Sequence, residues 1–279
     1  MRTPSTLALL LFAMMTACSD YQLDAHKGDE SGGTDDDVDD EVVVDTDTGE
    51  DDPGGDTDDD AVVETAEAPT YVNTSDALYA WDPDGELELI AGFWSPDGAV
   101  QDITDIAIDG DGYIYGCSNS TLYRIHAETG QALGLASIDL YLAGLTFVSD
   151  GRLVGAGDGV YLIDPTDGSF EILVEEGLYT TSGDIVGLPD GLLYWTVWGE
   201  EDGDPDRLIV IDPDTGRTVD RGDAGVERIF GLGYADDVLY GFTDAATVVR
   251  IDPDFGGATQ ERPLGAGGWW GATTNPVRW

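Results

Sequence analysis

From residue 70 onward, short apolar runs alternate with turn sequences rich in Asp and Gly. One turn recurs five times, each time after an apolar run. The first copy reads Trp81-Asp82-Pro83-Asp84-Gly85 and the fourth reads Ile211-Asp212-Pro213-Asp214-Thr215-Gly216. In such a turn Asp accepts backbone hydrogen bonds, Pro presets φ and Gly releases the chain, so each copy predicts a tight connection between two strands.

A second turn precedes each of the last four copies. It contains Asp-Gly between β-forming residues, as in Asp111-Gly112, or Asp236-Asp237 in the last copy, and it predicts another hairpin. Each unit therefore contains four predicted strands. Equivalent turn positions (Asp82, His126, Asp164, Asp212 and Asp252) are 44, 38, 48 and 40 residues apart, a period typical of β-propeller blades.

Four complete units cover about 102–138, 142–177, 182–223 and 228–264. The tail 269–279 resembles the first two strands of a unit, and residues 77–90 resemble the last two. Together they predict a fifth blade shared between the two ends, which closes the ring and removes the exposed sheet edges. The expected fold is an all-β, five-bladed propeller that occupies residues 70–279 and acts as a monomer.

The N-terminal segment predicts export and anchoring. Residues 1–17 contain one basic residue, Arg2, followed by a short apolar stretch typical of a secretory signal. Met15-Thr16-Ala17-Cys18 then resembles the lipobox of bacterial lipoproteins. The resemblance implies a lipid on Cys18 and, with Ser19 in second position, the outer membrane of a Gram-negative cell, on either face. The alternative is a secreted protein with an unrelated Cys near its cleavage site.

The segment 18–69 is predicted to be a disordered stalk, because it contains 21 acidic residues and only one Lys between Ser19 and Pro69. Calcium sequestration and an export signal are its alternatives. Residues 70–279 hold the other 37 acidic residues and nine Arg, a net charge of −28. This charge argues against nucleic acid and anionic membranes as direct partners, and it suits calcium or a cationic partner.

The repeats resemble the bacterial propellers of the NHL-repeat, gluconolactonase-like and quinoprotein-like families. The similarity rests on Asp105-Ile106-Ala107-Ile108, Asp111-Gly112-Tyr113-Ile114-Tyr115-Gly116 and Leu122-Tyr123-Arg124-Ile125, and it covers nearly all of 76–279. It implies the fold but no single activity, because these families differ in what they do. Gluconolactonase-like enzymes hold a channel metal with Glu, Asn and Asp, of which only the Asp element is found here. Quinoprotein dehydrogenases have a larger ring and basic contacts to their cofactor.

The start of each innermost strand is expected to face the central channel. The equivalent positions are Asp105, Gly144, Asp184, Gly231 and Gly271, with Arg228 nearby. Asp105, Asp184 and Arg228 are therefore a candidate site for a cation or a small polar ligand. The alternative is that short residues are needed where five strands converge.

One loop interrupts the repeat and carries Asp202, Asp204 and Asp206. Alternate carboxylates can converge on calcium, although Arg207 replaces the Gly that an EF-hand requires. A solvated acidic loop is the alternative. Trp195 and Trp198 precede this loop, and one of them is a candidate contact for a sugar or peptide, with core packing as the alternative.

No catalytic residue is assigned. Cys117 is expected to be a small buried residue, and the two histidines, His26 and His126, lie in the stalk and in a turn. A nucleophile activated by His therefore lacks its base. The favoured function is a membrane-anchored module that binds a protein, peptide or glycan. The alternative is a metal-dependent hydrolase or lactonase that uses the channel carboxylates.

Overall fold

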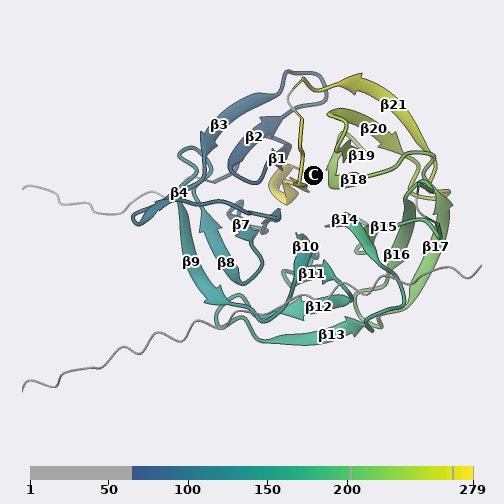
Figure 1. Ribbon diagram of the computed structural model, residues 1–279, viewed down its shortest axis with the longest axis horizontal. Coiled ribbons are helices and arrows are strands. Elements are labelled where there is room, and N and C mark those ends of the chain that lie inside the picture. Colours follow the sequence, from purple (N-terminus) through teal and green to yellow (C-terminus); the bar gives the residue numbers. More distant parts are fainter. Residues whose placement is uncertain (1–64, 202, 266, 279) are drawn as a thin grey trace, which may run out of the picture. The chain divides into compact units, whose positions relative to one another are not determined.

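The computed structural model describes residues 65–278 apart from 202 and 266. These residues form five four-stranded antiparallel sheets arranged around a central axis (Figure 1). The first strand of each sheet lies innermost and contacts the first strands of its neighbours. The predicted five-bladed propeller is thereby confirmed.

The strands of blades 1 to 4 follow chain order. Blade 1 contains β6 (Asp105–Ile108), β7 (Ile114–Cys117), β8 (Thr121–Ile125) and β9 (Ala132–Ser137). Blade 2 contains β10 (Leu142–Phe147), β11 (Leu153–Gly157), β12 (Val160–Ile163) and β13 (Phe170–Val174). Blade 3 contains β14 (Thr181–Gly187), β15 (Leu193–Val197), β16 (Arg207–Ile211) and β17 (Thr218–Asp223). Blade 4 contains β18 (Ile229–Ala235), β19 (Val238–Thr243), β20 (Thr247–Ile251) and β21 (Ala258–Pro263).

Blade 5 joins the two ends of the described chain. Its order is β22 (Gly271–Thr274), β1 (Thr70–Asn73), β2 (Ala77–Trp81) and β3 (Glu88–Gly92). The predicted shared blade is present, but the C-terminal segment supplies one strand and not two. After β22 the chain forms a short 3-10 helix, η1 (Pro276–Arg278), because Pro276 cannot donate to a strand and suits the first position of a helix.

Residues 65–69 belong to the folded unit, although their sequence is continuous with the acidic stalk. Ala66 is buried, and its N–H donates to the carbonyl of Gly112 (2.7 Å). The amides of Glu67 and Ala68 donate to the hydroxyl of Tyr71 (2.9 and 3.2 Å). The predicted signal, the lipid on Cys18 and most of the stalk lie outside the described residues.

The repeated turns have the geometry that their sequence predicts. Oδ1 of Asp164 accepts the N–H of Thr166 (2.8 Å), and Oδ1 of Asp212 accepts that of Asp214 (2.9 Å). In the copy that lacks Asp, Nδ1 of His126 accepts the N–H of Glu128 (3.2 Å), so the histidine fills the same role. The turns set the blade period because each one reverses the chain at a fixed point.

The hydrophobic core lies between the blades. The buried apolar side chains form five clusters, and each cluster combines residues of two neighbouring blades. Trp81 of blade 5, for example, packs edge to face on Tyr240 and Phe242 of blade 4, with ring centroids 4.8 and 5.1 Å apart. Burying one such side chain contributes about 1.5–3 kcal/mol, so each blade depends on both neighbours.

Two short strands, β4 (Trp94–Ser95) and β5 (Gly98–Ala99), form a hairpin at the outer edge of the ring between blades 5 and 1 (Figure 1). Within the described part of the chain, no helix has the length and apolar character needed to cross a membrane.

Candidate functional site

The five inner strands bring their predicted channel positions together. A Cβ at Gly144 would lie 2.9 Å from the amide nitrogen of Ile185, and one at Gly231 would lie 2.9 Å from Cβ of Ala272. A Cβ at Gly271 would overlap Oδ1 of Asp105. The glycines are therefore required by the close approach of neighbouring inner strands, which favours the steric explanation of these positions.

Asp105 and Asp184 fill the space that the glycines leave. Both are fully buried, with 0% of their surface exposed. Oδ2 of Asp105 accepts the N–H of Leu145 in blade 2 (2.5 Å). Oδ2 of Asp184 accepts the amides of Leu232 in blade 4 (2.6 Å) and Ala272 in blade 5 (3.2 Å). Asp105 thus ties the inner strand of blade 1 to that of blade 2, and Asp184 ties the inner strand of blade 3 to those of blades 4 and 5.

The two carboxyl groups also interact with each other. Burial raises the pKa of Asp105 well above its ordinary value, and the nearby charge of Asp184 raises it further. Burial likewise raises the pKa of Asp184, although hydrogen bonds from Asp105 and from backbone amides oppose this. Two adjacent buried carboxyl groups disfavour each other's ionisation, so we expect the pair to share a proton near neutral pH.

A hollow of about 190 Å³ lies directly above this pair, at the end of the channel where the inner strands begin. Each blade contributes to it the residue that precedes its channel position. These residues are Thr104, Ala143, Gly183, Phe230 and Trp270, and Tyr141 and Ser182 complete the lining. We call this hollow, at the mouth of the propeller channel, the channel mouth.

Aromatic side chains dominate the channel mouth. Tyr141 is 57% exposed and Trp270 is 39% exposed, while Phe230 is partly buried. Trp198, also 39% exposed, packs against Phe230 with perpendicular rings and centroids 6.2 Å apart. A ligand in the channel mouth would therefore meet Tyr141, Phe230 and Trp270 directly, with Trp198 beside them.

Trp195 has a different position from Trp198. It is fully buried between blades 2 and 3, and its Nε1 donates to Oγ1 of Thr181 (3.0 Å). Of the two tryptophans that the sequence singles out, only Trp198 is accessible to a ligand.

The acidic loop does not bring its described carboxylates together. Asp204 is exposed, and its Oδ2 accepts the N–H of Glu201 (3.0 Å). Asp206 is fully buried, and its Oδ2 accepts the hydroxyl of Ser182 (2.6 Å) and the amide of Ile229 (2.7 Å). Asp202 lies outside the described residues, so the calcium site at this loop stays a prediction.

Two further candidates have structural partners. The guanidinium of Arg228 pairs with Asp244 at the surface (3.1 Å) instead of facing Asp105 and Asp184. Cys117 is buried next to Thr104, and burial raises the pKa of its thiol to about 12. Among the residues that the structure describes, no group of three His, Cys, Asp or Glu side chains is arranged to hold a metal ion.

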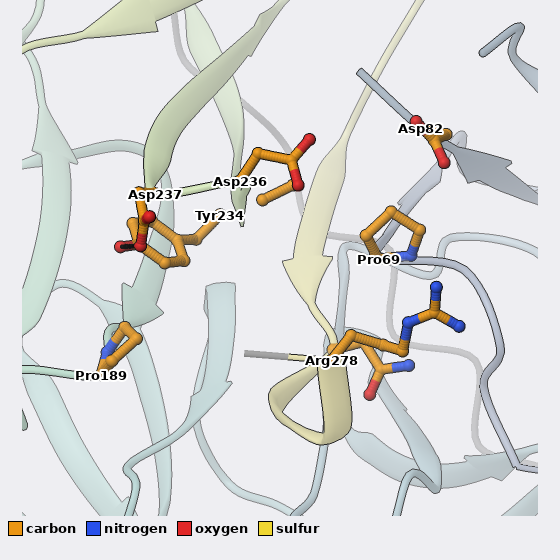
Figure 2. A pocket seen from close by; sticks show the side chains of 9 residues that line it. Pro69, Asp82, Pro189, Tyr234, Asp236, Asp237 and Arg278 are labelled. Atoms are coloured by element: carbon orange, nitrogen blue, oxygen red, sulfur yellow. Dashed lines mark hydrogen bonds between the residues drawn. The ribbon is translucent and has the colours of Figure 1, made fainter. Parts of the chain in front are cut away.

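A second hollow, of about 430 Å³, lies at the opposite end of the blades. Figure 2 shows its polar lining, with Asp236 and Asp237 across from Arg278. Nη1 of Arg278 donates to the carbonyl of Glu67 (2.9 Å), and Asp237 accepts the hydroxyl of Tyr234 (3.4 Å). Several of its charged and polar groups are thus already engaged within the protein, and it contains one aromatic side chain against three in the channel mouth.

No protein-family model matches the chain, and no curated protein matches it. Among solved structures, it is similar to the extracellular domain of a one component system from B. thetaiotaomicron, with 13% identity, a TM-score of 0.42 and coverage of 72% of this chain and 28% of that one. It is also similar to the extracellular domain of a hybrid two component system from that organism, with 14% identity, a TM-score of 0.42 and coverage of 68% of this chain and 25% of that one. A protein of unknown function from Bacteroides caccae has 13% identity and a TM-score of 0.42, and the match covers 69% of this chain and 71% of that one. The chain spans about a quarter of the length of the first two chains.

Proposed function

We propose that this chain is a membrane-anchored, extracytoplasmic binding module whose ligand occupies the channel mouth. The observation that carries the proposal is the lining of that hollow, to which every blade contributes a residue and which includes three aromatic side chains. Aromatic rings bury a large apolar area at low cost in side-chain entropy, and concave sites of this kind are the usual ligand sites of proteins. The ligand would be a glycan, a peptide or a group of similar size on a larger partner.

The burial of the carboxyl groups supports binding over catalysis. Asp105 and Asp184 are inaccessible, and their oxygens accept backbone amides of neighbouring blades. A general base must lie within hydrogen-bonding reach of its substrate, and these groups lie beneath the floor of the hollow. Their proposed role is therefore to hold the inner strands in place.

Binding is tested by titrating the full chain with a panel of soluble glycans and short peptides, and it is detected by tryptophan fluorescence and by calorimetry. A ligand of the channel mouth should lose affinity with Trp270→Ala. Trp94→Ala is the matched control, because Trp94 is similarly exposed but lies in β4 at the outer edge of the ring (Figure 1). Equal losses in both variants, or none in either, would reject the channel mouth as the site.

The anchor is a separate part of the proposal and rests on the lipobox-like sequence that ends at Cys18. Cys18→Ser should move the protein from the membrane fraction to the soluble fraction and abolish incorporation of labelled fatty acid. Lipid labelling that survives in this variant would refute the anchor. Fractionation of the outer and inner membranes then tests the proposed outer-membrane location.

A metal-dependent hydrolase or lactonase is the second candidate. The observation in its favour is that Oδ1 of Asn73 and Oδ1 of Asp105 are buried without a donor and both approach Gly271. Carboxylate and amide oxygens are ligands for hard cations such as calcium. Calorimetry with calcium would detect such a site. Stoichiometric binding that is lost in Asp105→Asn, but kept when Asp204 is changed to Asn, would favour this candidate.

A further inference from the structure

The floor of the channel mouth offers few hydrogen-bond donors. Oγ1 of Thr104 donates to the carbonyl of Cys117 (3.2 Å), and Oγ of Ser182 donates to Oδ2 of Asp206 (2.6 Å). Each hydroxyl has one hydrogen, so what remains at both is acceptor capacity. A sugar, whose hydroxyls need donors as well as acceptors, would be poorly matched to this floor, whereas a cation needs only acceptors and aromatic faces.

The surroundings of the channel mouth are strongly acidic. The loops at this end connect the second strand of each blade to the third, and each blade to the next. They cover 74–76, 93–104, 118–120, 138–141, 158–159, 175–180, 198–206, 224–228, 244–246 and 264–270. Their described positions contain 13 acidic residues and one basic residue, Arg228, which is paired with Asp244. Such a charge distribution concentrates cations and repels carboxylates and phosphates.

Aromatic walls strengthen this preference. The face of a Trp, Tyr or Phe ring attracts an ammonium group, and such rings form the cages that recognise quaternary ammonium ions. Tyr141, Phe230 and Trp270 come from three different blades, so they surround the hollow instead of lining one side of it. The rings of Phe230 and Trp198 are perpendicular and do not stack on one another.

From these three observations we infer that the ligand of the channel mouth is a small organic cation with an ammonium group, either a free quaternary amine or the end of a lysine side chain. This inference rests on the proposed function and names its ligand class. The volume fits, because a cavity of about 150 Å³ holds one benzene-sized molecule and drug-sized ligands occupy about 300–1,000 Å³. The hollow, at about 190 Å³, takes one such group.

The experiment compares isosteric probes on the full chain. Choline represents the free quaternary amine and Nα-acetyl-lysine amide the lysine side chain, while 3,3-dimethylbutan-1-ol has the shape of choline without its charge. We expect choline or the lysine derivative to bind about tenfold more tightly than the neutral isostere, since a desolvated cation–π contact is of that order. Added salt should weaken binding of the cation and leave that of the neutral isostere unchanged.

Variants separate this inference from the proposed function. Trp270→Leu and Phe230→Leu keep an apolar wall but remove the ring, and they should abolish the preference for the cation, whereas Trp94→Leu should not. If choline and its neutral isostere bind equally, or if glucose binds and both cations do not, the ligand class is wrong although the channel mouth still binds. If neither cation binds at millimolar concentration, the inference is also overturned, and the glycan and peptide panel then decides the proposed function.

Discussion

Asp184→Asn tests whether the buried carboxyl pair holds a proton. We expect the folded pair to retain one proton, because burial raises the pKa of both groups and two adjacent buried carboxylates repel each other when both are ionised. In the unfolded chain both groups have an ordinary pKa near 4 and are ionised above about pH 5. The folded state therefore binds one proton more than the unfolded state across this window.

The sign and the size of the effect follow from linkage. A raised pKa in the folded state stabilises the protein at low pH, and this stabilisation is lost as pH rises toward the folded pKa. Because the folded state binds one extra proton, the free energy of unfolding falls by about 1.4 kcal/mol for each unit that the pH rises. Between pH 5 and 7 the loss is about 3 kcal/mol, or roughly 6–12 °C in Tm for a domain of this size.

The variant should lose this part of the pH dependence. The oxygen of an Asn at position 184 can accept the amides of Leu232 and Ala272, and its NH₂ group can donate to Asp105 without a proton from solvent. The amide of Ile185 loses its acceptor, which lowers stability equally at every pH and leaves the slope unaffected. Urea unfolding at pH 5, 6 and 7, in EDTA and at constant ionic strength, is followed by fluorescence of the buried Trp81, Trp195 and Trp269.

Glu171→Gln is the control for the removal of one surface charge, because Glu171 is exposed on the outer strand β13. The wild-type chain and the control should share a steep slope of stability against pH, and Asp184→Asn should have a shallower one. Equal slopes in all three proteins would refute the shared proton. Asp206, whose pKa burial also raises, contributes in the same direction and accounts for a residual slope in the variant.

Three other outcomes are expected. Gly271→Ala should destabilise the domain by about 1–3 kcal/mol or more in urea, because the added methyl overlaps Oδ1 of Asp105, whereas Gly110→Ala, with no neighbour near its Cβ, should not. Thr146→Val should lower the free energy of unfolding by about 1–3 kcal/mol, because the buried amide of Gly187 loses its acceptor, Oγ1 of Thr146 (2.9 Å). Thr146→Ser keeps a hydroxyl acceptor and should be more stable than Thr146→Val. Equal stability of the two variants would contradict this role. In a chain with Cys18→Ser, Cys117 should resist thiol reagents at pH 8 until urea unfolds the domain, because its thiol is buried and has a pKa of about 12. Rapid labelling of the folded protein would count against this burial.

The blade number could be predicted because it depends on local chemistry. Asp82, Asp164 and Asp212 act on amides two residues away, so the turns that delimit the blades are encoded within short windows. The strand β1 was not predicted, since four residues beside an acidic stalk carry little pattern of their own. Thr70–Asn73 becomes a strand because β2 and β22 offer partners on both sides.

The channel mouth could not be read from the sequence in the same way. Tyr141, Phe230 and Trp270 lie far apart in the chain and share no motif. A usable signal existed in the alignment of the repeats, since Phe230 and Trp270 each precede a predicted channel glycine. Asp105 and Asp184 lie on the innermost strands β6 and β14, where the alignment of the repeats places them, but their complete burial depends on how tightly the five strands converge.

The placement of β22 determines when the molecule can become a ring. This strand follows every other strand in chain order and pairs with β1, the earliest of them. During synthesis, β1 must therefore remain without its inner partner until the last strand is available. In that interval β1 and the side of blade 4 that faces β22 are open to pairing with other chains. The length of the intervening chain thus sets how long these strand edges stay open, and a stop codon before β22 would release an open array prone to aggregation.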